Sequence, residues 1–224
     1  ADALIDAIAV PATLASVDAH GHGTRVAGIA LFGDLAAQLQ SGVLERPFRL
    51  CAARVVDDTG NFAATALAPN IMREAIGTLH ERHDCRIFVV ALADRYSVYD
   101  GGKVGAWAAT LDELARDLDV VIICTSGNRT PRSGEALEEA VTEYPRYLSE
   151  EDNRLFEPGG AINAITVGAL AQGPGLGEEH GQDARVRPIT AALEPSPFTR
   201  VGPGPEGAIK PDFVEIGGTM VFDP

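Results

Sequence analysis

Three apolar runs stand out along the chain, at residues 48–56 (FRLCAARVV), 86–92 (RIFVVAL) and 120–125 (VVIICT). Each run is nearly continuous in hydrophobicity and does not alternate between apolar and polar positions. Runs of this kind are typical of parallel strands that are buried on both faces of a sheet. The pattern therefore predicts three buried strands.

Between these runs, apolar side chains recur every three or four residues, which predicts amphipathic helices over 67–83 and 104–118. The apolar positions of the two segments are Leu67, Ile71, Ala75, Ile76 and Leu79, and then Val104, Trp107, Leu111, Leu114, Ala115 and Leu118. Strands and helices that alternate at this spacing predict a parallel α/β sheet with right-handed crossover connections.

After Asn128 the sequence becomes polar and acidic, and residues 129–158 are predicted to be an insertion with a short surface helix at 135–144. Strands are expected at 161–170 and 212–216, and the glycine-rich, charged segment 173–187 is expected to be an exposed loop. The chain contains no internal repeat and no long low-complexity linker. Residues 1–224 are therefore predicted to form a single domain.

The chain has 224 residues and a formal net charge of −14, with 46% hydrophobic and 22% charged residues. This balance is that of a folded globular protein. A strong negative charge argues against binding to nucleic acid and to anionic membrane surfaces, because both require clustered Lys and Arg. No run of 18 apolar residues is present, so no transmembrane helix is expected.

The three cysteines, Cys51, Cys85 and Cys124, are widely spaced, and each lies in an apolar run. Free buried thiols in a reducing compartment explain this pattern better than a disulfide framework. The first residues lack both the basic start of a signal peptide and an initiating Met. The chain is therefore expected to be a piece of a longer protein, located in the cytoplasm and not secreted.

The segment most informative about chemistry is 18–28 (DAHGHGTRVAG), in which small residues surround His22 and an apolar helical stretch follows. A histidine in the first turn of a buried helix has a fixed backbone, and the positive helix end disfavours its protonated form. It could therefore act as a general base that faces a cleft. Two other interpretations stay open: His20 and His22 are structural loop histidines, or they bind a metal with Asp18, which is a weak signal without a fourth ligand.

Residues 22–28 (HGTRVAG) resemble the HGTxVAG histidine motif of the subtilases, the subtilisin-like serine proteases. Further segments resemble pieces of that family in the same order along the chain, so that the resemblance covers residues 18 to about 218. These segments are 53–60 (ARVVDDTG), 121–128 (VIICTSGN), 158–169 (PGGAINAITVGA), 198–203 (FTRVGP) and 210–213 (KPDF).

The resemblance implies a subtilisin-like α/β fold with three layers, in which helices flank a parallel sheet on both faces. It implies a serine endopeptidase with a peptide or protein substrate, in which His22 is the general base and Asn128 stabilises the oxyanion. Taken alone, Gly127-Asn128 is equally typical of a turn. The residues that would line the substrate-binding walls are Ala91, Leu92, Ala93, Thr125, Ser126 and Gly127. No cofactor or catalytic metal is implied, and a structural calcium ion is not evident.

The chain departs from the family pattern in three places. Asp2, Asp6 and Asp18 lack the strand and the small-residue–Gly setting of the family's catalytic Asp, and Gly218-Thr219-Met220 only partly matches the serine motif. The chain is therefore interpreted as a catalytic domain trimmed at both ends and inactive by itself. Ala93 stands where a glycine is usual. Asp94 and Arg95 would either favour charged substrates or form a solvated loop, and the loop is the expectation.

Two other functions were weighed against the protease. The departure at Ala91–Asp94 is compatible with a non-catalytic domain of the same fold that binds peptides or partner proteins. A doubly wound nucleotide-binding domain is disfavoured, because no glycine-rich phosphate loop follows a strand.

Overall fold

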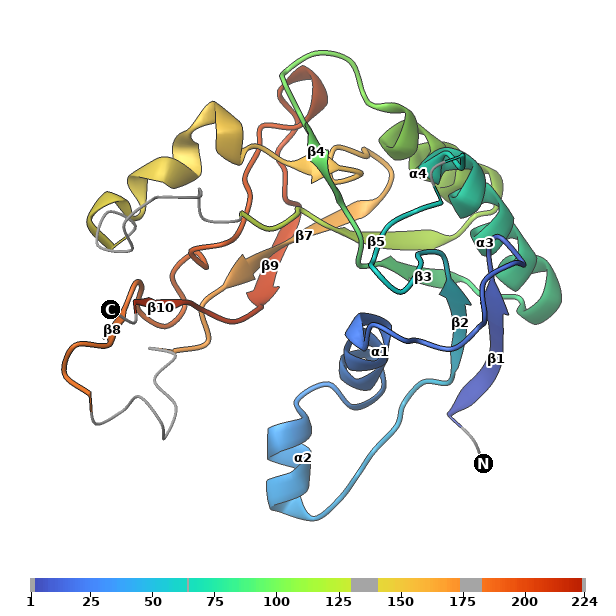
Figure 1. Cartoon of the computed structure of the whole chain (residues 1–224), viewed down its shortest axis with the longest axis horizontal. Coiled ribbons are helices and arrows are strands. Elements are labelled where there is room, and N and C mark those ends of the chain that lie inside the picture. The colour runs from blue at the N-terminus through green and yellow to red at the C-terminus, as the bar shows by residue number, and fades with distance from the viewer. Residues whose placement is uncertain (1–2, 64, 130–140, 174–182, 223–224) are drawn as a thin grey trace. The chain divides into compact units, whose positions relative to one another are not determined.

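The structure is a computed structural model that describes residues 3–63, 65–129, 141–173 and 183–222. The chain forms two compact units, residues 1–86 (unit 1) and residues 87–224 (unit 2). Each unit is described by itself, and Figure 1 shows the elements of both. The mixed α/β fold with a parallel sheet is confirmed, whereas the single domain stays a prediction.

Unit 1 is built on two parallel strands, β1 (Leu4–Ala9) and β2 (Leu50–Arg54), with Asp6 opposite Cys51 in the ladder. The sequence predicted β2 but not β1. The β1 sequence, LIDAIA, has three residues of low strand propensity, so its conformation is set by pairing with β2 and not by local preference. The prediction that Asp6 does not lie in a strand is therefore wrong.

Helix α3 (Ala68–His83) confirms the helix predicted at 67–83. Pro69 lies in the first turn, where its missing N–H costs no hydrogen bond, and Asp84 ends the helix in a left-handed conformation with φ of 51°. The expected apolar face is buried except for Leu67, the N-cap residue, which is exposed. The buried residues are Ile71, Met72, Ala75, Ile76 and Leu79.

Helix α1 (His22–Phe32) begins at the predicted histidine and is followed by α2 (Leu35–Ser41). None of the residues of α1 is buried, so the expectation of a buried helix is wrong. The helix contacts α2 and β2, which leave part of its apolar surface open: Ile29 is 70% exposed.

Unit 2 contains a parallel sheet of four strands in the order β3-β5-β7-β9. These strands are β3 (Ile87–Val90), β5 (Val121–Thr125), β7 (Ile165–Leu170) and β9 (Phe213–Ile216), which confirms the four predicted positions. Helix α4 (Ala106–Asp117) connects β4 to β5 and packs on β5 (Figure 1). Its buried face is the predicted one and includes Trp107, Leu111 and Leu114.

The continuous hydrophobicity of these strands predicted that both faces of the sheet are buried. The structure does not agree with this prediction. Ile122 and Cys124 of β5 are buried, whereas Ile87, Val89 and Val121 lie between 44% and 60% exposed. In the described part of unit 2 the one long helix is α4, and it covers a single face. Alternate residues of β3 and β5 consequently face away from this packing.

Two short antiparallel pairs were not predicted: β4 (Asp94–Val98) with β6 (Phe156–Glu157), and β8 (Arg187–Pro188) with β10 (Val221–Phe222). The expectation of a loop at Asp94-Arg95 is therefore wrong, although both residues are exposed. Unit 2 also contains the short 3-10 helices η1 (Arg146–Ser149), η2 (Glu151–Asn153) and η3 (Pro205–Gly207).

Most of the helix predicted at 135–144 and of the loop predicted at 173–187 lies outside the described residues. Among the helices that the structure does describe, none has the length and apolar character needed to cross a bilayer.

Candidate functional site

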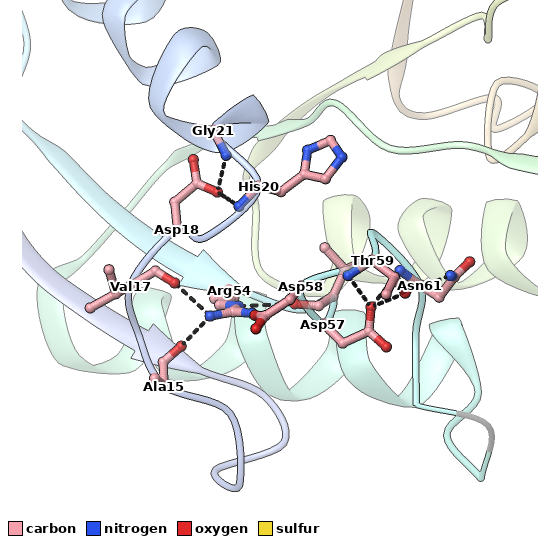
Figure 2. Close-up of polar contacts among 11 residues, drawn as sticks. Ala15, Val17, Asp18, His20, Gly21, Arg54, Asp57, Asp58, Thr59 and Asn61 are labelled. Carbon is pink, nitrogen blue, oxygen red and sulfur yellow. Dashed lines mark hydrogen bonds and ion pairs between the residues drawn. The ribbon is translucent and has the colours of Figure 1, made fainter.

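The histidine segment is organised by the side chain of Asp18. Its Oδ1 atom accepts hydrogen bonds from the backbone N–H groups of His20 (3.0 Å) and Gly21 (2.8 Å). Its Oδ2 atom accepts from the backbone N–H (2.7 Å) and the hydroxyl (2.8 Å) of Thr24. Figure 2 shows this carboxylate turned toward the turn that precedes α1. Asp18 lies three residues before Gly21, the N-cap residue of α1, and its side chain thus caps the N-terminus of this helix.

These hydrogen bonds lower the pKa of Asp18 below its ordinary value, first through the backbone and side chain of Thr24 and then through Gly21. The carboxylate therefore stays ionised at neutral pH and fixes the turn on which His22 is placed. Both carboxylate oxygens are engaged by this turn. Among the described residues, no group of three or more His, Cys, Asp or Glu side chains is arranged to hold a metal ion.

His22 is the first residue of α1, and its side chain is exposed, as is that of His20. The predicted placement of a candidate base at the first helical turn is thus observed. Unit 1 also contains a carboxylate–histidine pair at another place. Asp6 of β1 lies 2.7 Å from Nε2 of His83, at the end of α3. This contact lowers the pKa of Asp6, chiefly through the hydrogen bond to His83.

Arg54, the last residue of β2, holds the loop that leads into the histidine segment (Figure 2). Its guanidinium donates to the carbonyl oxygens of Val17 (2.6 Å) and Ala15 (3.3 Å), and Nε donates to that of Val56 (3.0 Å). It also forms an ion pair with Asp58. Because the Arg54 side chain is only 13% exposed, it anchors this loop from the strand. The sequence resembled the family here but gave no sign of this role.

In unit 2, the predicted wall residues lie at one edge of the sheet. Val90 of β3 pairs with Cys124 of β5 in a parallel ladder, so the segments that follow the two strands leave the same edge. These segments are Ala91–Ala93 and Ser126–Asn128. The structure therefore brings together the six residues predicted to bind substrate: Ala91, Leu92, Ala93, Thr125, Ser126 and Gly127.

The turn from β5 to Asn128 depends on glycine at position 127. Gly127 has φ of 94°, a left-handed conformation that favours glycine, and its N–H donates to Oγ1 of Thr125 (3.1 Å). A Cβ atom here would lie 2.7 Å from Cδ2 of Phe156. Asn128 follows as an exposed residue in an isolated bridge with Thr199. Its exposure leaves the side-chain amide accessible, as a donor to an oxyanion requires.

Phe156 is a residue of this region that the sequence did not single out. Its N–H donates to the carbonyl of Ser126 (3.1 Å), and its ring is covered by the Arg200 guanidinium at 3.4 Å from the ring centroid. Burial, and then the charge of Arg129, lower the pKa of Arg200 to about 10, which still leaves it charged at neutral pH. Phe156 thus forms a rigid aromatic support beneath the Ser126-Gly127 turn.

Glu157, the next residue, lines a pocket of about 200 Å³ at the N-terminus of α4. Asp94 and Glu157 are paired in the β4–β6 ladder, and the Glu157 carboxylate accepts a long hydrogen bond from the N–H of Ala108 (3.5 Å). Burial raises the pKa of Glu157, with a further contribution from Asp94, while the helix amides oppose the shift. The carboxylate thus caps α4 from a neighbouring strand.

The predicted catalytic residues lie in different units: His22 in unit 1 and Asn128 in unit 2. Each is placed within its own unit by identifiable contacts, the Asp18 cap in one case and the Gly127 turn in the other. Their roles as base and oxyanion donor stay predictions.

A family model described as the subtilase family matches residues 11–222 of this chain. The uncharacterized protein y4bN of Sinorhizobium fredii (strain NBRC 101917 / NGR234) is 62% identical over 156 residues, which cover 70% of this chain and 36% of that protein. The chain thus spans about a third of the length of this relative.

Among solved structures, the prenylagaramide maturation protease PagA is 18% identical, with a TM-score of 0.46, over 89% of this chain and 51% of that one. The psychrophilic subtilisin-like protease Apa1 from the Antarctic psychrotroph Pseudoalteromonas sp. AS-11 is 12% identical, with a TM-score of 0.36, over 58% of this chain and 22% of that one.

Proposed function

The chain belongs to the subtilase family, and from this membership we propose that it is the part of a subtilisin-type serine endopeptidase that carries the base and the oxyanion donor. The substrate is a peptide or protein, and the reaction needs no cofactor. We further propose a cytoplasmic location in a bacterium, because the cysteines are free and a relative that is 62% identical comes from a bacterium.

In this mechanism His22 accepts the proton of a serine hydroxyl as that oxygen attacks the peptide carbonyl, and later gives the proton to the leaving amine. Asn128 donates a hydrogen bond to the oxygen of the tetrahedral intermediate, where negative charge develops. Asp18 fixes the turn on which His22 is placed, through its hydrogen bonds to His20, Gly21 and Thr24. It is therefore a positioning residue and not the acid of the triad.

One observation carries this proposal: Ala91–Ala93 and Thr125–Gly127 leave the same edge of a parallel sheet, and Asn128 follows directly. A peptide substrate could lie between these two segments with its reacting carbonyl near the Asn128 amide. Ligands of open α/β sheets bind at this carboxyl edge of the strands.

The experiment is fluorophosphonate labelling of the full-length gene product beside its His22→Ala and Asn128→Ala variants. An activated serine in the wild type should react, and His22→Ala should abolish the labelling because the base is lost. Asn128→Ala should slow the labelling without abolishing it. A folded wild-type protein that is never labelled would overturn the assignment of His22 and Asn128 to catalysis.

A second function is a non-catalytic subtilase domain that binds peptides or partner proteins. It is favoured by Ala93, whose methyl group stands where close approach of a substrate backbone is expected. Under this alternative, the full-length protein would bind peptides at the same sheet edge but show no labelling and no turnover. The labelling experiment therefore separates the two functions.

A further inference from the structure

Two of the three cysteines, Cys51 and Cys85, lie next to each other in unit 1. Cys51 is the second residue of β2, and Cys85 follows Asp84, the residue that ends α3. Both are half-buried and free. They come from segments that are distant in the sequence, and the thiol of Cys51 is close enough to raise the pKa of the Cys85 thiol.

Other contacts place the end of α3 independently beside this part of β2. Asp6 is opposite Cys51 in the β1–β2 ladder, and its carboxylate reaches His83, two residues before Cys85. His80 holds the Cys85 carbonyl through Nδ1 at 3.0 Å. Helix α3 also contacts β2 directly. These contacts hold the segment that carries Cys85 beside the part of β2 that carries Cys51.

We propose that Cys51 and Cys85 form a redox-sensitive dithiol that closes reversibly to an intramolecular disulfide. In reducing conditions both stay thiols, in agreement with the free cysteines of the structure. Under oxidation the bridge links the first part of β2 to the end of α3. The third thiol, Cys124, is buried at 2% exposure in β5 of unit 2 and takes no part.

The oxidant is a low-molecular-weight disulfide such as oxidised glutathione. The Cys51 thiolate attacks one sulfur of that disulfide, and the S–S bond breaks to release one thiolate and leave a mixed disulfide on Cys51. Cys85 then loses its proton to solvent and attacks the Cys51 sulfur, which expels the second thiolate. Two protein thiols are oxidised and one small disulfide is reduced to two thiols, because the two protons lost by the protein are taken up by the two thiolates that leave.

The order of attack follows from the protonation of Cys85. Burial, followed by the hydrogen bond and charge of Cys51, raises the pKa of Cys85 to about 11, so this group is the protonated donor of the pair. Closure of the bridge should therefore accelerate with pH, by roughly tenfold per unit between pH 7 and 9, wherever deprotonation of Cys85 limits the rate.

The bridge lies on the strand that also anchors the histidine segment. Cys51 and Arg54 are both in β2, and Arg54 holds the Ala15 and Val17 carbonyls of the loop before Asp18. Oxidation would tie this strand covalently to α3. The proposal does not depend on proteolysis, since it concerns two thiols of this chain and is measured without turnover.

The experiment equilibrates the folded 224-residue chain in glutathione buffers from fully reduced to fully oxidised and then blocks free thiols with an alkylating reagent. The expected product is monomeric, has lost two hydrogen atoms in mass, takes up one alkyl group where the reduced chain takes up three, and yields a linked Cys51–Cys85 peptide. Excess dithiothreitol should restore all three thiols. The Cys124→Ser variant is the matched control and should close the bridge as the wild type does.

Cys51→Ser and Cys85→Ser should each stop closure and leave a glutathione adduct on the remaining partner, with circular dichroism as the check of folding. The proposal is overturned if the folded wild type keeps three alkylatable thiols, if it stops at the mixed disulfide, or if Cys124 or a second copy of the chain supplies a sulfur. These results come from the wild type, so a misfolded variant does not obscure them. They are also independent of whether fluorophosphonate reacts.

Discussion

Asp18 offers a test of how one carboxylate holds the histidine turn. Its pKa is lowered by the hydrogen bonds to Thr24 and Gly21, so it stabilises the fold above the ordinary aspartate pKa near 4. This contribution is lost as the pH falls through the lowered pKa. We expect Asp18→Asn to lower the melting temperature by about 2–4 °C at pH 7 and to make it less sensitive to acid between pH 5 and 2.

The measurement is thermal unfolding followed by circular dichroism across this pH range, with Asp58→Asn as the control. The Asp58 side chain is 76% exposed, and its carboxylate forms an ion pair with Arg54. If the melting temperature of Asp18→Asn fell with decreasing pH as much as that of the wild type, the helix cap would not depend on an ionised carboxylate.

Gly105 and Glu157 form a second pair whose contact can be tested. Gly105 is the N-cap of α4, with ordinary dihedral angles of −68° and 163°, so alanine is permitted by the backbone. A Cβ atom there would nevertheless overlap the Glu157 carboxyl group. Gly105→Ala should therefore displace this carboxylate from the helix amides and destabilise the protein by about 1 kcal/mol.

A double-mutant cycle in urea checks this explanation. Gly105→Ala should cost clearly less in a Glu157→Ala background, because no carboxylate is then left to displace. Equal costs in both backgrounds would mean that the penalty arises from the backbone of α4.

At the scale of elements, the sequence predicted most accurately the positions of those helices and strands that have one side buried within their own unit. Helices α3 and α4 and the strands β3 and β5 have strong apolar patterns, and their positions agree with the structure. The short pairs were missed because they carry little local signal: β6 has only two residues and its partner, β4, is exposed. Such strands depend on pairing with distant segments, which periodicity does not report.

The same contrast holds for the candidate site. His22, Asn128 and the wall residues follow from motifs with a fixed order, and the sheet edge gathers the wall as expected. Phe156 lies in no recognised motif, and the motif that contains Arg54 did not indicate its role, because each residue acts through contacts with residues far away in the sequence. An alternation of exposed and buried side chains in β3 and β5 was equally hidden, since every position of these strands except Thr125 is apolar.

Arg54 links an element to the site, and its guanidinium geometry gives a prediction. Arg54→Lys keeps the charge but loses the planar group that bonds Val17, Ala15 and Val56 together. We expect amide hydrogen exchange in residues 15–24 to quicken by roughly an order of magnitude, with β3 and β5 unchanged. Hydrogen–deuterium exchange with mass spectrometry measures this, and Arg86→Lys, an exposed arginine paired with Asp84, is the control.

At the scale of the whole molecule, the proposed chemistry is incomplete in this chain. Gly218-Thr219-Met220 matches the serine motif of the family only in part, and residues 1–224 contain no full match to that motif. We expect the 224-residue chain not to hydrolyse fluorogenic peptides above the background rate. Turnover that disappeared in His22→Ala would contradict this expectation, because it would require another nucleophile that uses the same base.

The division into two units predicts how the chain unfolds. Most buried apolar side chains lie in unit 2, whereas the buried apolar positions of unit 1 are Val10, Val55 and the inner face of α3. With less apolar surface buried, unit 1 should unfold at a lower urea concentration. The single tryptophan, Trp107, is buried in α4 and therefore reports on unit 2 alone. Circular dichroism should change before tryptophan fluorescence does.

The proposed bridge between Cys51 and Cys85 lies wholly in unit 1, so oxidation should act on one step of this unfolding. Closing the loop between the two cysteines should stabilise unit 1 by about 3–4 kcal/mol in the chain-entropy model. The early circular dichroism step should then move to higher urea, while the Trp107 transition stays in place, and Cys51→Ser should remove the shift. Coincident transitions in the reduced chain would show instead that the two units unfold as one cooperative structure.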